Sequence, residues 1–450
     1  MKQVKHRTWF SMLFVLALAA GLGLLLYRYV VDGGRWAAFS ANTHIYTAGR
    51  LTQGSVRDRN GVVLYDFATN EYNDDKTVRK ATLHAVGDAG GNIATGARLK
   101  FRARLCGFSP LTGTTAGGHN AYLTIDSKLN TAAWEALDGA RGTVGVYDYT
   151  TGQILCMVSN PSFDPENPPD SVDGGKYDGV YMNRFLSSTF TPGSVFKIVT
   201  LSAAIENIDG LFDRKFTCTG SCEIDGEKIT CPAAHGDMDI YGALANSCNC
   251  VFAQLAVEMG GNTLARYADK LGLLGSVNVS GIATAAGSYD AAPDGSADLG
   301  WSGIGQYSDL VNPCAMMTLM STIANEGTTV EPQLFLKETD ALGVPLSIYT
   351  AEKTVGGLKS ATCAKLKDML RNDVTEHYGQ EKFGDLAVCA KSGTAEVGAG
   401  KAPHAWFTGF VDDSKHPLAF VVVVENGGGG AAVAGSVAAK VLSAAAELGY

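Results

Sequence analysis

The pattern of hydrophobic and polar residues begins with one long apolar stretch near the start of the chain. Residues 8–27, TWFSMLFVLALAAGLGLLLY, carry no charge, and about twenty such residues form a helix that can cross a bilayer. Basic residues precede this stretch, which favours an N-terminus in the cytoplasm. We therefore predict a cytoplasmic tail at 1–7, a transmembrane anchor at 8–31 and a single-pass plasma-membrane protein whose remaining chain lies outside. An A-x-A pattern at 17–19 leaves a cleaved signal peptide as the alternative, but the apolar run continues beyond it.

Residues 36–120 show short β-type runs separated by turn signals. In GSVRDRNGVVLYD, residues 54–66, β-forming residues flank Asn60-Gly61, a pattern that predicts a hairpin. The Gly-rich segment TAGGHN at 115–120 predicts a joint. We expect residues 36–120 to form a small, β-rich, membrane-proximal pedestal domain.

Beyond this joint the pattern switches between the strand and helix periods. Residues 121–137 begin as a strand and continue as a helix, with Asp126 or Ser127 as its cap. Residues 141–160 then predict a two-stranded hairpin that turns at 150–152.

The remaining chain is mostly helical over 185–330, apart from a Cys-rich hairpin. Three strand-like runs follow, at 386–397, 404–413 and 418–426, and a helix at 431–448 closes the chain. Their short connections favour neighbouring antiparallel strands. Strands at both ends with helices between them predict one α+β domain over 121–450.

Composition excludes one class of partner. Only 18% of the 450 residues are charged, as expected of a folded protein. The net charge is −9, and no stripe of basic residues occurs beyond the first residues. We therefore expect no nucleic acid as a partner.

Cys218, Cys222 and Cys231 cluster with His235 in CTGSCEIDGEKITCPAAHG. Their spacing permits a Cys₃His zinc site, although the usual C-x-x-C knuckle is missing. A Cys218–Cys231 disulfide across a hairpin fits the pattern better than zinc, and unpaired thiols in a reducing habitat are the third alternative.

Ser194 and Lys197 lie three residues apart in FTPGSVFK, at the start of a predicted helix. Residues at this spacing share a helix face, and a neutral lysine can take the proton of a neighbouring serine. S-x-x-K alone is weak evidence, because a capping hydroxyl followed by a solvated lysine gives the same letters.

Two further motifs follow in order, and together the three indicate an active site. Ser247-Cys248-Asn249 falls in a helical pattern, and Lys391-Ser392-Gly393-Thr394 lies on the first closing strand. S-x-x-K, S-x-N and K-[ST]-G form the combination of penicillin-binding proteins and β-lactamases. The predicted catalytic residues are Ser194, Lys197, Ser247, Asn249 and Lys391, and the predicted substrate-binding residues are Ser392, Gly393 and Thr394. We expect neither a metal nor a cofactor in the reaction.

From about residue 45 to its end, the sequence resembles a class B penicillin-binding protein of the short subgroup, a peptidoglycan D,D-transpeptidase. The resemblance includes VRDRNG, ATLHAVGD, TTGQILCMVSNPSFDP, the three motifs and HAWFTGF. The sequence departs from the usual family pattern in two mild ways. Gln53-Gly54 stands where the family usually has Arg-Gly, and Cys248 is the middle residue of the S-x-N motif. The implied fold is an antiparallel sheet packed by helices, with a helical subdomain.

The resemblance implies the chemistry. Ser194 would form an acyl-enzyme with a D-Ala-D-Ala stem peptide or a β-lactam, with Lys197 as base and Ser247 as proton relay. Lys391 would lower the pKa of Lys197 and attract the substrate carboxylate. Backbone N–H groups of Ser194 and Thr394 would form the oxyanion hole.

Three alternatives share these motifs. A D,D-carboxypeptidase uses the same first half-reaction. A β-lactamase needs a water-activating base, but Glu258 lies at what we interpret as a helix terminus. A β-lactam sensor needs a cytoplasmic output domain, and no H-E-x-x-H occurs. By family analogy we expect peptidoglycan stem peptides, β-lactams, membrane lipid and a multi-span glycan polymerase as partners.

Overall fold

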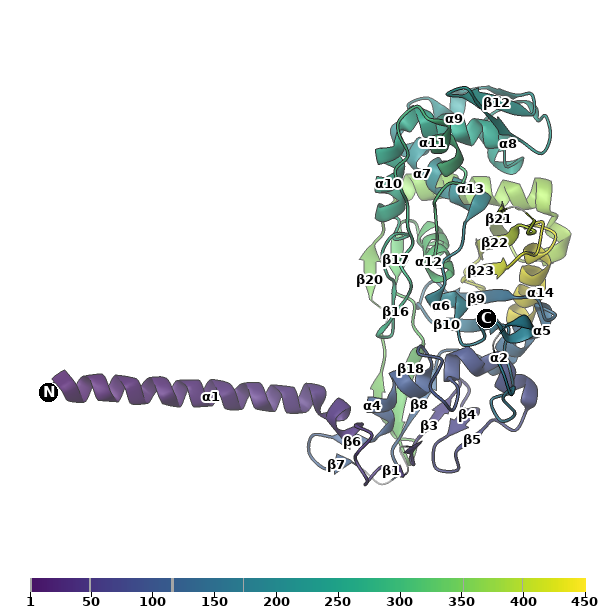
Figure 1. Ribbon diagram of the computed structural model, residues 1–450. Helices are drawn as coiled ribbons and strands as arrows, with labels where there is room; N and C mark the ends of the chain where they lie inside the picture. The colour runs from purple at the N-terminus through teal and green to yellow at the C-terminus, as the bar shows by residue number, and fades with distance from the viewer. Residues whose placement is uncertain (1, 48–49, 115–116, 173, 351, 399) are drawn as a thin grey trace.

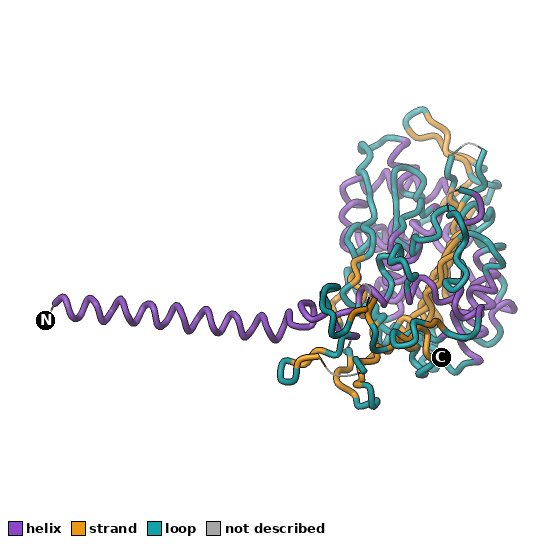
Figure 2. The backbone as a smooth tube through the Cα atoms, turned by 60° about the horizontal axis from the view of Figure 1, so that its bottom comes forward, coloured by secondary structure: helices purple, strands orange, loops and turns teal. Residues whose placement is uncertain are grey.

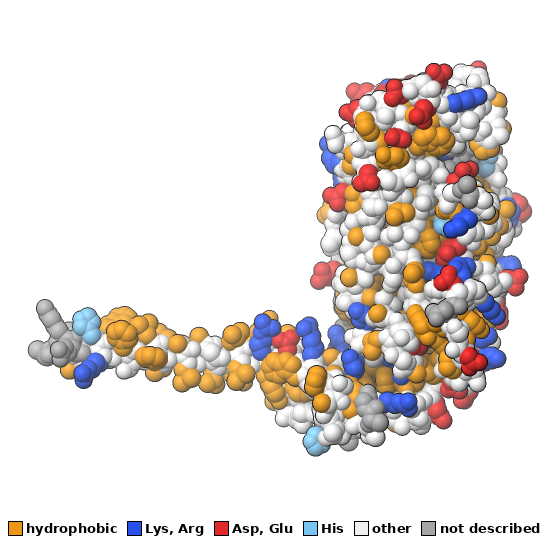
Figure 3. All heavy atoms as spheres, viewed as in Figure 1, with side chains coloured by type: hydrophobic (Ala, Val, Ile, Leu, Met, Phe, Trp, Pro, Cys, Tyr) orange, Lys and Arg blue, Asp and Glu red, His pale blue; other side chains and the backbone are white. Residues whose placement is uncertain are grey.

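An elongated body and one projecting helix make up the computed structural model, which describes residues 2–47, 50–114, 117–172, 174–350, 352–398 and 400–450. Helix α1 (Lys2–Ala37) leaves one end of the body, and most of its length lies clear of it in both views (Figures 1 and 2). The most apolar 18-residue window within His6–Ala37 has a mean hydropathy of 2.3 and is not buried, which fits a membrane anchor. Figure 3 shows hydrophobic side chains along this helix, with basic side chains near both ends.

A five-stranded antiparallel sheet forms the centre of the body, in the order β10-β9-β23-β22-β21. Its strands are β9 (Gly142–Asp148), β10 (Ile154–Asn160), β21 (Val388–Ala395), β22 (His404–Val411) and β23 (Leu418–Val424). The hairpin expected over 141–160 and the three antiparallel closing strands are therefore confirmed. The two groups join because β23 pairs with β9, with Val424 opposite Gly142.

Both faces of this sheet are buried, which explains the unbroken apolar run of β23. Its even-numbered residues contribute to the core under α5 (Ser127–Ala136) and α14 (Ala434–Glu447), and Val421 and Val423 contribute to the core on the other face. Helix α12 (Pro313–Ala324) packs on that other face. Asp126 caps α5 as expected, because its carboxylate accepts from the N–H groups of Lys128 and Leu129.

A second sheet lies at the α1 end of the body, in the order β19-β18-β8-β3-β4-β5. Its strands are β3 (Ser55–Arg57), β4 (Val63–Asp66), β5 (Glu71–Tyr72), β8 (His119–Leu123), β18 (Phe335–Asp340) and β19 (Pro345–Ile348). The hairpin expected at Asn60-Gly61 is confirmed. Two strands come from far along the chain, so this sheet is not completed by residues before 120. Residues 115–116 of the expected joint lie outside the described residues.

Helices and short hairpins form the end of the body opposite α1 (Figure 1). The helices are α7 (Lys197–Asn207), α8 (Ile240–Ala245), α9 (Asn249–Met259), α10 (Gly261–Lys270), α11 (Ala297–Ser302) and α13 (Ser360–Asp373). The Cys-rich segment forms two small pairs, β11 (Phe216–Cys218) with β14 (Gly236–Met238) and β12 (Ser221–Ile224) with β13 (Glu227–Thr230). Helix α9 ends at Met259, so Glu258 lies at a helix terminus as interpreted.

The remaining elements connect these layers. They are α2 (Lys76–Val86), α3 (Ala97–Lys100), α4 (Arg102–Leu105), α6 (Arg184–Ser187), β1 (Tyr46–Thr47), β2 (Arg50–Leu51), β6 (Phe108–Ser109), β7 (Gly113–Thr114), β15 (Asn278–Val279), β16 (Ile282–Ala283), β17 (Thr328–Val330) and β20 (Lys353–Val355). The C-terminal part of α1 packs on α4 and β6, where the rings of Tyr29 and Phe108 meet edge to face.

Candidate active site

One cleft brings the three sequence motifs together. It has a volume of about 770 Å³ and lies between the helical end of the body and strand β21. The predicted residues that line it are Ser194, Ser247, Asn249, Ser392 and Thr394. Lys197 and Lys391 are fully buried and do not line it.

Ser194 lies in a 3₁₀ turn, Gly193–Phe196, that leads directly into α7. Gly193 has φ 55°, and a Cβ there would lie 2.9 Å from the carbonyl oxygen of Thr394. Only glycine allows the turn to pack this closely on β21. The hydroxyl of Ser194 has no hydrogen-bond partner among the described residues and faces the cleft, as a nucleophile requires.

Lys197 is the first residue of α7, and its amine is directed at the S-x-N motif. Its Nζ lies 2.6 Å from the carbonyl oxygen of Ser247, 3.1 Å from the Ser247 hydroxyl and 2.8 Å from Oδ1 of Asn249. Burial, followed by the like charge of Lys391, lowers the pKa of Lys197 well below its ordinary value of 10.5. A neutral amine can accept a proton, so this environment suits a general base.

The S-x-N motif interrupts the helical pattern in which the sequence placed it. Ser247 has φ 50° and lies in the turn between α8 and α9, and Asn249 begins α9. The expected continuous helix is therefore wrong at this point, because the turn is needed to direct Ser247 and Asn249 at Lys197. Nδ2 of Asn249 also donates to the carbonyl oxygen of Thr230, 2.8 Å away, which connects the motif to the end of β13.

The K-S-G motif lies on β21 as expected, with its two hydroxyl residues on one side. Ser392 and Thr394 face the cleft, whereas Lys391 and Gly393 alternate to the buried side. A Cβ on Gly393 would lie 2.8 Å from the carbonyl oxygen of Pro192, so this glycine lets β21 approach the turn that carries Ser194.

Tyr378 organises the K-S-G motif, although no sequence signal identified it. It ends a π-helical turn, Val374–Tyr378, that extends α13. Its hydroxyl lies 3.0 Å from Nζ of Lys391, 3.1 Å from the backbone nitrogen of Ser392 and 3.0 Å from the Ser392 hydroxyl. One phenol thus connects the buried lysine to the serine that faces the cleft.

Asp373 is a second buried group that sequence analysis missed. It ends α13, is fully buried, and both its carboxylate oxygens lack hydrogen-bond partners among the described residues. Burial raises the pKa of Asp373 to about 7, against the opposing effect of the charges on Lys391 and Lys197. The charge state of this carboxyl group is therefore coupled to the two lysines behind the cleft.

The predicted disulfide is not present in the structure. All ten are free thiols, so a Cys218–Cys231 disulfide is wrong for this structure. The sulfur atoms of Cys218, Cys231 and Cys248 and a ring nitrogen of His235 lie within 4.8 Å of one another. Cys248 belongs to this group and Cys222 does not, because the tertiary fold brings the S-x-N turn against the hairpins.

Comparisons with known proteins agree with this geometry. Residues 142–444 match the family described as penicillin binding protein transpeptidase domain. The peptidoglycan D,D-transpeptidase PbpA of Mycobacterium tuberculosis is 28% identical over 367 residues, which cover 72% of this chain and 71% of that protein.

Solved structures share the fold. The penicillin G acyl-enzyme complex of penicillin-binding protein A from M. tuberculosis superposes with a TM-score of 0.74 at 25% identity, over 88% of this chain and 99% of that one. A peptidoglycan synthase complex, described as coordinating polymerization and crosslinking, gives a TM-score of 0.62 at 26% identity, over 73% of this chain and 63% of that one. The expected α+β transpeptidase fold is thus confirmed. The chain belongs to the penicillin-binding protein transpeptidase family, as a class B member.

Proposed function

We propose that the chain is a serine D,D-transpeptidase that cross-links peptidoglycan stem peptides through an acyl-enzyme on Ser194, and that β-lactams acylate and inhibit it. One observation carries this proposal. The unpartnered hydroxyl of Ser194 faces the same cleft as the S-x-N and K-S-G motifs, and the buried amine of Lys197, with its lowered pKa, contacts the S-x-N motif.

In the first half-reaction Ser194 Oγ attacks the carbonyl carbon of the penultimate D-alanine. Its proton passes to neutral Lys197, the C–N bond to the terminal D-alanine breaks, and the leaving amine receives a proton through the Ser247 hydroxyl. In the second half-reaction the amine of another stem peptide attacks the ester, and the proton it releases restores the Ser194 hydroxyl. Both steps conserve charge and need no cofactor.

Residues of the K-S-G and S-x-N motifs, on the two sides of the cleft, bind the substrate. Ser392 and Thr394 donate hydrogen bonds to the terminal carboxylate, which the positive charge of Lys391 attracts from behind the strand. The side chain of Asn249 binds the substrate amide. Backbone N–H groups of Ser194 and Thr394 stabilise the oxyanion, a role supported by the close packing of the 3₁₀ turn on β21.

We further propose that residues 8–31 anchor the protein in the plasma membrane, with residues 1–7 in the cytoplasm and the catalytic domain, residues 121–450, outside. Support comes from the apolar, unburied length of α1 and from the basic residues before it. Residues 36–120 serve as the pedestal between the anchor and the catalytic domain.

A multi-span membrane polymerase is the proposed partner, because cross-linking requires nascent glycan strands nearby. The similar peptidoglycan synthase complex, which combines polymerization with crosslinking, supports this proposal.

The function is tested with Ser194→Ala and a fluorescent penicillin. We expect the variant to lose covalent labelling and to keep its melting temperature, whereas Ser187→Ala, an exposed serine of the preceding helix, labels like the wild type. Labelling of Ser194→Ala at the wild-type rate would overturn the assignment. Incubating the wild type with a stem-peptide donor and a labelled D-amino acid separates the two activities: exchange product indicates transpeptidation, and D-alanine release alone indicates a carboxypeptidase.

A further inference from the structure

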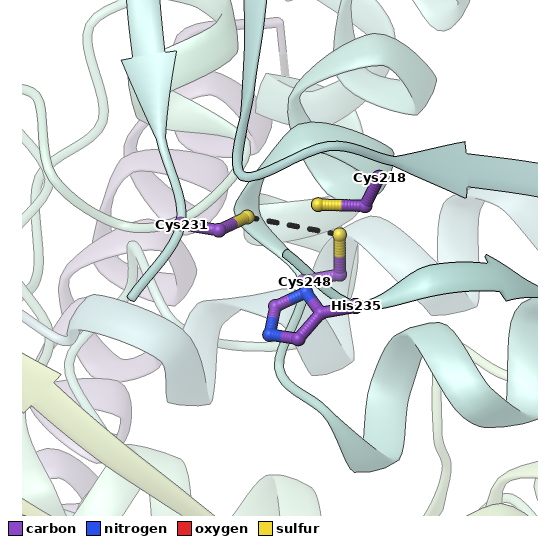
Figure 4. Close-up of side chains that lie close together, drawn as sticks. All are labelled: Cys218, Cys231, His235 and Cys248. Atoms are coloured by element: carbon purple, nitrogen blue, oxygen red, sulfur yellow. Dashed lines mark hydrogen bonds between the residues drawn. The ribbon is translucent and has the colours of Figure 1, made fainter. Parts of the chain in front are cut away.

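Four potential metal ligands from separate strands and turns of residues 218–248 converge beside the cleft (Figure 4). Cys218 ends β11, Cys231 follows β13, His235 precedes β14, and Cys248 lies between Ser247 and Asn249 of the S-x-N motif. Cys218 and Cys248 are fully buried, and the other two are half-buried. The proposed transpeptidase chemistry uses none of these four side chains.

The spacing of these atoms matches a tetrahedral ion. A zinc ion with Zn–S bonds of about 2.3 Å holds its sulfur ligands about 3.8 Å apart. Sγ of Cys231 lies 3.7 Å from Sγ of Cys248, and the whole set lies within 4.8 Å. A disulfide requires about 2.05 Å between sulfurs, so the thiols are arranged around a common centre and not as a bonded pair.

His235 gives a second, independent observation. Its Nδ1 is buried and has no hydrogen-bond partner among the described residues. A buried, unpartnered ring nitrogen is costly, and a metal ion that accepts its lone pair removes that cost. The imidazole lies beside the three thiols in Figure 4.

We propose that Cys218, Cys231, His235 and Cys248 bind one Zn²⁺ ion in a structural Cys₃His site. Binding releases the protons of the three thiols to solvent and leaves the imidazole neutral. Four protein ligands close the coordination sphere, so the ion holds the fold and activates no water. Cys222 and Cys250 lie outside the set, although Sγ of Cys250 is 3.5 Å from that of Cys231.

Such an ion would stabilise segments that have little else to hold them. The β11–β14 and β12–β13 pairs have strands of only three or four residues, and two-stranded pairs of this size are marginal alone. Thr230, Cys231 and Pro232 also line the cleft. The ion therefore joins one wall of the cleft to the turn that presents Ser247 and Asn249 to Lys197, a consequence that rests on the proposed function.

Metal content of the full-length chain, purified in detergent under reducing conditions, tests the site. We expect one zinc per chain by elemental analysis, and a thiolate-to-metal charge-transfer band after replacement by Co²⁺. Cys218→Ser and His235→Ala should lose the metal, His235→Cys should keep it, and Cys222→Ser, a neighbouring thiol outside the set, is the matched control. A metal-free wild type would overturn the proposal without reference to any variant.

Removing the ion tests its effect on the active site. A chelator should lower the melting temperature and slow penicillin acylation at least about tenfold, and added Zn²⁺ should restore both. An unchanged acylation rate in the zinc-free protein would refute the positioning effect. Ser194→Ala should still bind one zinc, so failure of the metal site and failure of the proposed function are distinguishable.

Discussion

Lys197 and Lys391 are both fully buried, yet their amines have different partners. Nζ of Lys197 contacts the S-x-N motif, whereas Nζ of Lys391 contacts the hydroxyl of Tyr378. Because like charges in a dry site repel, the pair is most stable with one amine and one ammonium. Burial and the charge of Lys391 lower the pKa of Lys197, so Lys197 is the neutral member of the pair.

Lys197→Arg tests the need for a neutral amine. Guanidinium keeps the positive charge but cannot act as a base at any accessible pH, so we expect penicillin acylation to fall more than about a hundredfold. Stopped-flow acylation rates measure the effect, and Lys440→Arg on the exposed side of α14 is the control. Acylation by the arginine variant within about tenfold of wild type would mean that Lys197 is structural.

Tyr378→Phe tests the residue that sequence analysis missed. The change removes one oxygen and leaves Lys391 and Ser392 without a shared partner. Unpaired buried polar groups cost about 1–3 kcal/mol, so we expect the second-order acylation rate to fall about tenfold or more. The loss should appear mainly as weaker binding before acylation, because Ser194 and Lys197 are untouched.

The control for this substitution is Tyr241→Phe, which removes a phenol hydroxyl bonded to Asp368 on an exposed surface. Equal acylation kinetics in the wild type and Tyr378→Phe would show that the phenol only fills space.

At the scale of elements, the segment between α11 and α12 supports the turn that carries Ser194. The N–H of Gly193 donates to the carbonyl oxygen of Gly305, 2.9 Å away, and Val311 forms an antiparallel bridge with Phe190. Asp309 lies in this segment and is fully buried, with the Ser302 hydroxyl 3.2 Å from its Oδ1. Because burial disfavours the charged form of this carboxyl group, the stability of the segment depends on pH.

Asp309→Asn should stabilise the protein at neutral pH. Burial raises the pKa of Asp309 to about 8, from 3.8 in the unfolded chain. Between these values the folded state binds the extra proton, so wild-type stability falls as pH rises from 4 towards 8. Across this range, the melting temperature of Asp309→Asn should increase relative to that of the wild type as the pH rises. Asp385→Asn, an exposed acid, should not change the profile, and a parallel profile for Asp309→Asn would contradict the assignment.

At the scale of the whole molecule, the cleft lies between the helical region and β21. Helix α1 leaves the body at the end opposite the helical region (Figure 1). Helix α1 joins the end that carries the six-stranded sheet, through its contacts with α4 and β6. The five-stranded sheet and its helices lie between that end and the hairpins of the helical region. This arrangement is consistent with the proposal that the catalytic domain is held away from the membrane.

Exchanging helix α1, residues 2–37, for an unrelated transmembrane helix of similar length tests the proposed partner contact and leaves strand β3 in its sheet. We expect the exchange to abolish co-purification with the membrane polymerase, because it replaces the part proposed to lie in the bilayer. Penicillin acylation should remain, since every residue of the cleft and of the two sheets is kept. Undiminished co-purification would mean that α1 does not make the contact.

Features that depend on local chemistry could be predicted from the amino-acid sequence. The apolar run of α1, the Asp126 cap, the turn at Asn60-Gly61 and the closing strands follow from residues adjacent in the chain. The three motifs predicted the candidate active-site residues, because their order and residue types are specific to one kind of chemistry. The family resemblance rested on the same motifs.

Features that depend on contacts between segments far apart in the chain could be seen only in the folded structure. Strands β18 and β19 join the six-stranded sheet, the S-x-N turn breaks a helical pattern, and Tyr378 contacts Lys391 without any motif. Cys248 joins the thiols of the hairpins, while Cys222, nearer to them in sequence, does not. Local patterns carry no information on these pairings, because each is set by the packing of the whole body and not by neighbouring residues.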